Sequence, residues 1–226
     1  MMQKPKTRAT PRISISKLGE YMVATPARRR GIIRDQKQPR DVIVARYGDV
    51  YAAVAECLAR NGDVSAVHDR LEQLYKAVPK TTWEAQDKQL SAEALEAFLT
   101  FVDEIDLSGF EVTRPGDTPL MQVAGVGVSV RPELLLRASG DTQPTGAVKL
   151  YVSKLFAFDD KSGAYATTIL HQFMDDVVSS HRAQPNGCLV VDIFERRVHV
   201  TPRAYKKRRK DIEAACEEIA QRWAAV

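Results

Sequence analysis

The hydrophobic pattern of this chain changes near residue 109, and that change constrains the fold more than any other feature. Before it, apolar residues recur at helical spacing. After it, β-branched and apolar runs are separated by glycines, a pattern typical of strands and turns. The pattern predicts helices over Asp49–Arg60, Val64–Ala77 and Ser91–Ile105, and strands over Met121–Val130, Glu133–Arg137 and Ala147–Ser153.

Shorter signals complete the organisation. Ser14-Ile15-Ser16 predicts a cap for a helix starting at Lys17, which Thr25-Pro26 ends or bends. Further helices are expected over Ala27–Gln38, Gly163–Ser180 and Pro202–Trp223, and strands over Cys188–Phe194 and Val198–Thr201. We predict a disordered basic arm (residues 1–12), a helical region (13–108) and a mixed α/β, or α+β, core with a C-terminal basic helix (109–226).

Composition excludes several protein classes. No run of about 18 apolar residues exists, so no membrane span is expected. The basic N-terminus is not followed by the apolar segment of a secretory signal. Cys57, Cys188 and Cys216 are odd in number and far apart, which argues against a disulfide framework or a zinc site. We expect buried cysteines and a cytoplasmic protein.

The net charge of +4 conceals a strong segregation. Residues 1–46 contain twelve Lys or Arg and three acids, a net +9, and residues 196–210 contain eight Lys or Arg and no acid. The rest of the chain therefore carries a net −13. If the two basic segments lie together, they have the charge of a polyanion site. The alternative is two solvated basic segments that complement an acidic body.

The basic run at residues 206–210 favours the functional interpretation. It occupies the first turns of the predicted closing helix, where the helix dipole disfavours cations by a few tenths of a kcal/mol each. Five cations there lower the stability of the helix, so a polyanion is a reason to keep them. These residues are Lys206, Lys207, Arg208, Arg209 and Lys210.

A Pro-Glu pair followed by a strand has the layout of a metal-dependent nuclease site. Such a site holds a divalent cation on a Pro-Asp pair and on an acid-x-Lys triplet in the next strand. Here the first acid is Glu133, but Lys149 stands where the second acid belongs and Tyr151 where the Lys belongs. A hard cation needs oxygen ligands, usually more than one carboxylate. The layout is therefore clearer than the activity.

The order of these motifs resembles that of RecB-like nucleases of the PD-(D/E)XK superfamily. Ser14-Ile15-Ser16-Lys17-Leu18 with Tyr21 and Pro26 resembles their opening motif. The stretches 126–135 and 146–151 resemble their metal-binding hairpin and acid-x-Lys strand, Gln172 falls where the family has a Gln motif, and residues 188–200 resemble the closing strands. The resemblance implies a restriction-endonuclease-like core sheet flanked by helices, behind an N-terminal helical region.

The departures from that family imply a degenerate active site. Family members with an iron–sulfur cluster carry Cys near the opening Pro and three more near the end. Here position 25 is Thr and only Cys216 lies near the end, so no cluster and no other cofactor is expected. A migrated site remains open, with Glu133 and Asp175 as acids and Lys149 or Lys154 as the cationic group. Only then is Mg²⁺ or Mn²⁺ expected, with Glu133 as a ligand.

Three functions therefore compete. The favoured hypothesis is a non-catalytic nuclease-like protein that binds nucleic acid, DNA before RNA, in bacterial or phage DNA processing or defence. The second is an active metal-dependent nuclease with the migrated site. The third is a protein-interaction subunit that binds no nucleic acid. For the first, the expected phosphate contacts are Arg28, Arg29, Arg30, Lys149, Lys206, Lys207, Arg208, Arg209 and Lys210.

Overall fold

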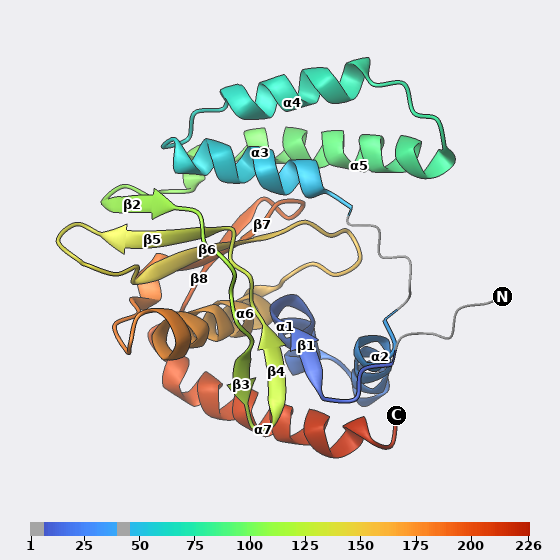
Figure 1. The fold of residues 1–226 in the computed structure, drawn as a ribbon, viewed down its shortest axis with the longest axis vertical. Helices are drawn as coiled ribbons and strands as arrows, with labels where there is room; N and C mark the ends of the chain where they lie inside the picture. Colours follow the sequence, from blue (N-terminus) through green and yellow to red (C-terminus); the bar gives the residue numbers. More distant parts are fainter. Residues whose placement is uncertain (1–6, 40–45) are drawn as a thin grey trace.

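The fold has three layers, with helices on both sides of a five-stranded sheet (Figure 1). The structure, a computed structural model, describes residues 7–39 and 46–226. Its strands are β1 (Arg12–Ser14), β2 (Phe110–Thr113), β3 (Met121–Val123), β4 (Val126–Ser129), β5 (Leu134–Ala138), β6 (Gly146–Tyr151), β7 (Cys188–Asp192) and β8 (Arg197–Val200). Its α-helices are α1 (Ile15–Val23), α2 (Pro26–Lys37), α3 (Gly48–Ala59), α4 (Ser65–Lys76), α5 (Thr82–Leu99), α6 (Asp160–Phe173) and α7 (Tyr205–Trp223). Short 3₁₀ turns lie at Val102–Glu104 and Pro185–Gly187.

The large sheet has the strand order β2-β5-β6-β7-β8. All neighbouring pairs are antiparallel except β6 and β7, which run parallel with α6 between them in the chain. A parallel pair needs such a crossover, whereas antiparallel neighbours can be joined by tight turns. A second sheet, β1-β4-β3, lies beside it, with β1 parallel to β4.

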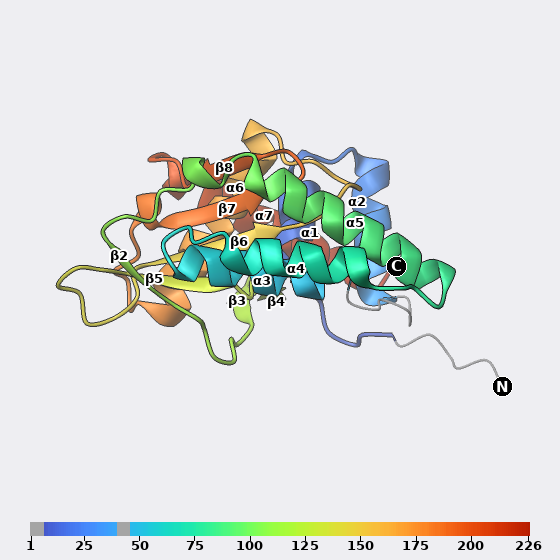
Figure 2. The ribbon, with the colours of Figure 1, turned by 90° about the horizontal axis from the view of Figure 1, so that it is seen from above.

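Helices α3 and α5 lie over one face of the large sheet, and α4 packs on their outer side (Figure 1 and Figure 2). The even-numbered side chains of the central strand β6, Val148 and Leu150, are buried on this face. They pack with Leu189 and Val191 of β7 and with apolar side chains such as Phe98 of α5. Alternation along a strand sends every second side chain to the same face, so one strand serves two cores.

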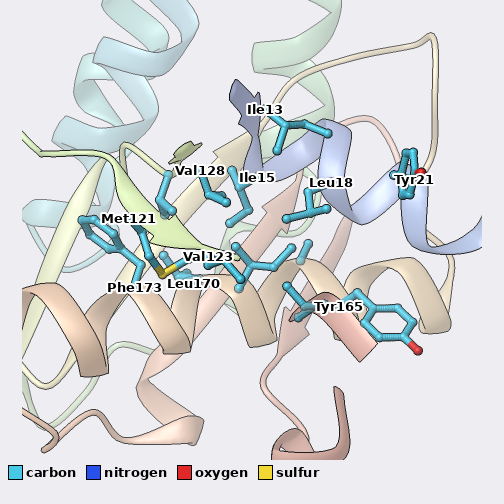
Figure 3. Packing of buried hydrophobic residues seen from close by; sticks show 14 of the residues in the cluster. Ile13, Ile15, Leu18, Tyr21, Met121, Val123, Val128, Tyr165, Leu170 and Phe173 are labelled. Carbon is cyan, nitrogen blue, oxygen red and sulfur yellow. The ribbon is translucent and has the colours of Figure 1, made fainter. Parts of the chain in front are cut away.

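Helices α1, α6 and α7 and the small sheet cover the opposite face (Figure 3). Ala147 of β6 and Val190 of β7 belong to this second core. Ile15 and Leu18 of α1 and Phe173 of α6 belong to it, and all three are fully buried. Gly19 lets α1 approach α6 closely, since a Cβ there would lie 3.0 Å from the Phe158 ring and 3.3 Å from Ala166 Cβ.

The mixed α+β class predicted from the sequence is confirmed. Ser14 caps α1 by accepting a hydrogen bond from the Lys17 amide, and the helix predicted over Ala27–Gln38 is α2. The helix predicted over Asp49–Arg60 is α3, and Asn61 and Gly62 just after it have the positive φ angles of a helix stop. All three cysteines are buried and free, as predicted.

Several element boundaries differ from the prediction. A helix starting at Ser91 is wrong, because Thr81 caps α5 by accepting from the Glu84 amide, and Ser91 is buried within the helix. The first turns of α5 are polar and carry little hydrophobic periodicity. The strand predicted over Met121–Val130 is two strands, because Ala124 and Gly125 turn with positive φ. The helix predicted over Gly163–Ser180 is α6, which ends at Phe173 and is followed by a π-helical turn, Met174–Val178.

The N-terminal region also differs from its predicted organisation. The arm predicted over residues 1–12 lies partly outside the described residues, but from Arg8 onward it packs on the body. The Arg8 amide donates to Lys37 O at 2.8 Å, the Trp223 indole donates to Arg8 O at 3.3 Å, and Arg12 begins β1. The predicted helical region (13–108) serves two layers, since α1 and α2 lie on one side of the sheet and α3–α5 on the other (Figure 1).

Across residues 7–39 and 46–226, none of the helices combines the length and apolar character that crossing a membrane requires.

Candidate functional site

Glu133 and Lys149 form an ion pair where the central strand β6 runs past the start of β5. The ladder between β5 and β6 begins at Leu134 opposite Val148, so β6 extends past the start of β5. Glu133 Oε2 accepts a hydrogen bond from the Leu150 amide at 2.6 Å, and Glu133 Oε1 lies 2.5 Å from Lys149 Nζ. The carboxylate thus takes the place of a strand carbonyl and satisfies an amide that the ladder leaves open.

This ion pair is largely sheltered from water. The Lys149 and Glu133 side chains are 14% and 16% exposed, and Lys149 Nζ lies 5.5 Å from the centre of the Tyr51 ring. Burial raises the pKa of Glu133, and Lys149 and the Leu150 amide oppose that rise. Burial, followed by the Glu133 charge, also raises the pKa of Tyr51.

The pair does not fit a divalent cation. Both oxygens of Glu133 are engaged, one by an ammonium and one by an amide. A Mg²⁺ or Mn²⁺ ion needs several oxygen ligands and would meet the Lys149 charge at the same carboxylate. Tyr151, where the family motif has Lys, turns its hydroxyl away and donates to Phe156 O at 2.7 Å. The arrangement is that of a structural ion pair.

Asp175 belongs to a different cluster, beyond the C-terminal end of α6. Its Oδ2 lies 3.0 Å from Arg209 Nη2 of α7, and its Oδ1 accepts from the Ala183 amide at 3.3 Å. The same Arg209 Nη2 lies 2.8 Å from His171 Nδ1, a geometry that requires the unprotonated form of that nitrogen. Among the described contacts, none joins Asp175 to Glu133 or Lys149. The three residues of the predicted migrated site therefore fall into two places.

Asp175, Asp176 and His181 are close enough together to hold a metal ion. Arg209 already occupies the space between the acids, with Nη1 3.6 Å from Asp176 Oδ1 as well as the contact to Asp175. Asp176 and His181 are exposed, as acidic groups without an ion often are. The donor set is therefore explained by Arg209, which anchors α7 to α6.

The predicted cations of α7 divide into two groups. Arg209 is 22% exposed and fixed to His171 and Asp175, and Arg208 lies over the Tyr165 ring at 6.0 Å. Lys206, Lys207 and Lys210 are exposed, and none of them forms an ion pair within the part of the chain that the structure describes. We call these three residues the α7 lysines. They form an exposed cationic surface at one end of α7.

The predicted arginines of α2 are mostly neutralised. Arg28 Nε lies 2.6 Å from Glu20 Oε1, and Arg29 Nη1 lies 3.3 Å from Glu218 Oε2 of α7. Arg29 Nε also donates to Tyr21 O at 3.1 Å. Only Arg30 of the three is exposed with no ion pair to a described residue.

One basic segment contains the first turns of α7, and the other contacts α7 nearer its C-terminal end (Figure 1). Arg29 reaches α7 at Glu218, which lies 8 to 12 residues after the basic run at residues 206–210. At 1.5 Å per residue this separation is about 12–18 Å. The segments therefore form two surfaces along α7 and do not merge into a single patch.

Sequence reasoning missed two buried acids. Glu20 is 4% exposed and binds both Lys17 and Arg28, and its only sequence signal is an acid on the same face of α1 as Lys17. Asp192 is fully buried and ends β7, where it accepts hydrogen bonds from the Phe158 and Glu195 amides. Burial raises the pKa of Asp192 to about 6. An Asp inside an apolar strand, here 188–194, is the signal that identifies it.

No protein-family model matches this chain, and a search of curated proteins finds no match.

Proposed function

We propose that this chain is a non-catalytic nuclease-like protein that binds nucleic acid, DNA before RNA, through exposed cations. The resemblance to RecB-like nucleases supports a restriction-endonuclease-like core. The resemblance implies an opening helix, a hairpin over residues 126–135, a strand over 146–151, a helix and closing strands. The order of α1, β6, α6 and β7-β8 is compatible with it, but residues 126–135 form β4 and the start of β5, which belong to different sheets and do not pair as a hairpin. On that resemblance the setting is cytoplasmic, in bacterial or phage DNA processing or defence.

The observation that carries the proposal is the occupation of the expected metal site by Lys149. Its ammonium lies 2.5 Å from the one carboxylate at that position. Hydrolysis of a phosphodiester on a metal needs an ion that neutralises the phosphate and activates a water. A buried carboxylate committed to Lys149 and the Leu150 amide is not available for that task. On this proposal the chain keeps the motif order of a nuclease without the donor set of one.

The α7 lysines support the binding part of the proposal. Lys206, Lys207 and Lys210 lie within the first six residues of α7, which has no acid in its first turn. Cations placed there are disfavoured by the helix dipole, and an anionic partner would offset that cost. A phosphate backbone is such a partner, and its binding to lysines is strongly dependent on salt.

The test is a binding and cleavage assay on the purified full-length chain. Labelled single- and double-stranded DNA and RNA are titrated at low and at physiological salt, with Mg²⁺ or Mn²⁺ in half of the samples. The proposal expects affinity that falls steeply with salt, and intact nucleic acid in every sample. Affinity unchanged by salt, or metal-dependent cleavage that Glu133→Ala abolishes, would overturn it. A stoichiometric protein partner without nucleic acid would favour an interaction subunit instead.

A further inference from the structure

A groove of about 600 Å³ lies between the N-terminal segment and the β3–β4 hairpin. It lies outside the elements that carry Glu133, Lys149 and the α7 lysines. Its volume is in the range of sites that hold small ligands. One wall is formed by residues 8–12 and Pro39, and the other by Leu120, Gln122, Gly125 and Gly127.

The N-terminal wall is fixed to the rest of the molecule. The Arg8 amide donates to Lys37 O at the end of α2, and the Arg8 carbonyl accepts from the Trp223 indole at the end of α7. The Gly127 amide donates to Pro11 O at 3.0 Å, across the floor of the groove. The groove therefore has a preformed shape.

Two arginines line this groove, and no acid lines it with them. Arg8 and Arg12 are both half-buried and line it. Burial and then the Arg12 charge lower the pKa of Arg8, which places the two guanidinium groups within electrostatic reach of each other. Neither arginine pairs with any described carboxylate, and none of the lining residues is an Asp or Glu. Two cations held together in this way create a local demand for an anion.

The remaining polar groups of the groove also suit an anion. Arg8 Nη1 donates a hydrogen bond to Gln36 O at 3.1 Å. Arg12 makes no side-chain hydrogen bond within residues 7–39 and 46–226. Thr10 adds a hydroxyl and Gln122 a side-chain amide, both of which donate hydrogen bonds. Gly127 leaves space in the groove, because a Cβ there would lie 3.2 Å from Leu120 Cδ1 and 3.7 Å from Gln122 Nε2.

We propose that this groove binds a phosphate group, with Arg8 and Arg12 as its counter-charges. The planar guanidinium fork matches phosphate oxygens in geometry as well as in charge. The phosphate can belong to a nucleic-acid strand or to a free nucleotide. The strand source rests on the proposed function, whereas the groove and its charge do not.

The test follows backbone amide resonances of the ¹⁵N-labelled full-length chain. Four probes are added separately: inorganic phosphate, adenosine monophosphate, and a short single-stranded DNA with or without a 5′-phosphate. Shifts are expected at Thr10, Gln122, Gly125 and Gly127. Arg12→Gln should weaken binding about tenfold or more, because a charge-assisted hydrogen bond is lost, and Arg12→Lys should restore part of it. The control is Arg203→Gln, an exposed arginine that precedes α7.

The outcomes separate this proposal from the proposed function. Groove shifts that Arg12→Gln removes and Arg203→Gln leaves unchanged would support the site. Shifts with phosphate or nucleotide but no binding of DNA would support the groove and defeat nucleic-acid binding. DNA binding that moves α7 resonances and leaves the groove unmoved by all four probes would overturn the groove while the proposed function stands. Shifts equal in Arg12→Gln and in the unmodified chain would also overturn it.

Discussion

Two groups of cations in this molecule differ in their surroundings. Lys149, Arg28 and Arg29 each lie within 3.3 Å of a carboxylate oxygen. The α7 lysines have no such partner among the described residues and extend into solvent. The first group lies on the central strand β6 and on α2, whereas the second is gathered at one end of α7 (Figure 1).

The difference teaches that a cation-rich segment is not in itself a binding surface. An ion pair inside the fold satisfies a charge that would otherwise be costly to bury, and it leaves little charge to attract a ligand. An exposed lysine adds little to stability but contributes its full charge to the electrostatic field. The two groups should therefore respond oppositely to neutralisation. Variants of the first should change stability, and variants of the second should change binding.

The largest expected effect is on stability, at the Glu133–Lys149 pair. Glu133→Ala leaves the Lys149 ammonium without its partner and the Leu150 amide without its acceptor. Breaking a buried pair from one side costs about 3–5 kcal/mol, and the residual exposure of 14–16% places this pair toward the lower end. Urea unfolding monitored by circular dichroism measures the difference in the free energy of unfolding.

The control for this prediction removes both charges. Glu133→Ala with Lys149→Met should recover part of the lost stability, because no uncompensated buried charge remains. If Glu133→Ala unfolds at the same urea concentration as the unmodified chain, the pair is not structural. Glu133 would then be available as a ligand, and the expectation that paired cations stabilise the fold would be wrong for Lys149.

The next effect is on binding, at the α7 lysines. The triple variant Lys206→Gln, Lys207→Gln, Lys210→Gln should lower affinity for DNA by about 100-fold at low salt and reduce the salt slope by about 3. Its free energy of unfolding should stay the same or rise slightly, since cations leave the positive end of the helix dipole. Fluorescence anisotropy at several salt concentrations measures both quantities for affinity.

A matched variant on α2 sharpens this result. Arg28→Gln with Arg29→Gln removes cations that are already paired with Glu20 and Glu218. It should lower the free energy of unfolding and weaken DNA binding much less than the α7 triple variant does. Equal losses of affinity from the two variants would show that pairing does not decide which cations attract a phosphate backbone.

The general architecture was accessible from the sequence because it follows from local patterns. Hydrophobic spacing predicted the helices from α1 to α4 within a few residues, and the Gly and Pro positions marked their ends. The short strands β1 and β2 were missed, because three or four residues carry too little alternation to be detected. The start of α5 was missed because its first turns are polar and exposed.

The site was less accessible, because charge pairing is a long-range property. Arg29 and Glu218 lie 189 residues apart in sequence and only the fold brings them together. Lys149 was predicted to contact phosphate, but in the fold its ammonium pairs with Glu133, which directly precedes β5. Arg8 and Arg12 were assigned to an arm, because the contact that holds Arg8 comes from Trp223 at the far end of the chain.

A smaller effect is expected at a buried acid that has no cation. Asp192 accepts two amide hydrogen bonds, and burial raises its pKa from 3.8 to about 6. Its protonated form is favoured in the folded state, so its contribution to stability is complete below pH 3.8 and is lost as the pH rises through about 6. A shift of this size corresponds to about 3 kcal/mol over the whole titration.

Comparing Asp192→Asn with the unmodified chain isolates that contribution. The side chain of Asn cannot ionise, so the difference in the free energy of unfolding should move in favour of Asn by about 2 kcal/mol between pH 4.5 and pH 8. Denaturant unfolding at several pH values measures it. If this difference in the free energy of unfolding stays constant with pH, Asp192 is as easily ionised in the fold as in the unfolded chain. The lack of a cation partner would then not distinguish Asp192 from Glu133.

The smallest effect is expected at Glu20, whose partners reach water. Burial raises the pKa of Glu20, but the hydrogen bonds from Arg28 at 2.6 Å and Lys17 at 2.7 Å outweigh it, and the net direction is downward. Its stabilisation is therefore present above the ordinary value of 4.5 and is lost as the pH falls through the lower pKa of the folded state. Glu20→Gln should cost about 1–2 kcal/mol at neutral pH.

That cost should shrink in acid, where the carboxylate of the unmodified chain also becomes neutral. Arg28→Gln supplies the matched control, because the Arg28 side chain is 46% exposed and Glu20 keeps Lys17, so its removal should cost less than that of the acid. If the two substitutions cost the same at every pH, burial of the acid does not matter. The Glu133–Lys149 pair would then be the remaining support for the difference between paired and exposed cations.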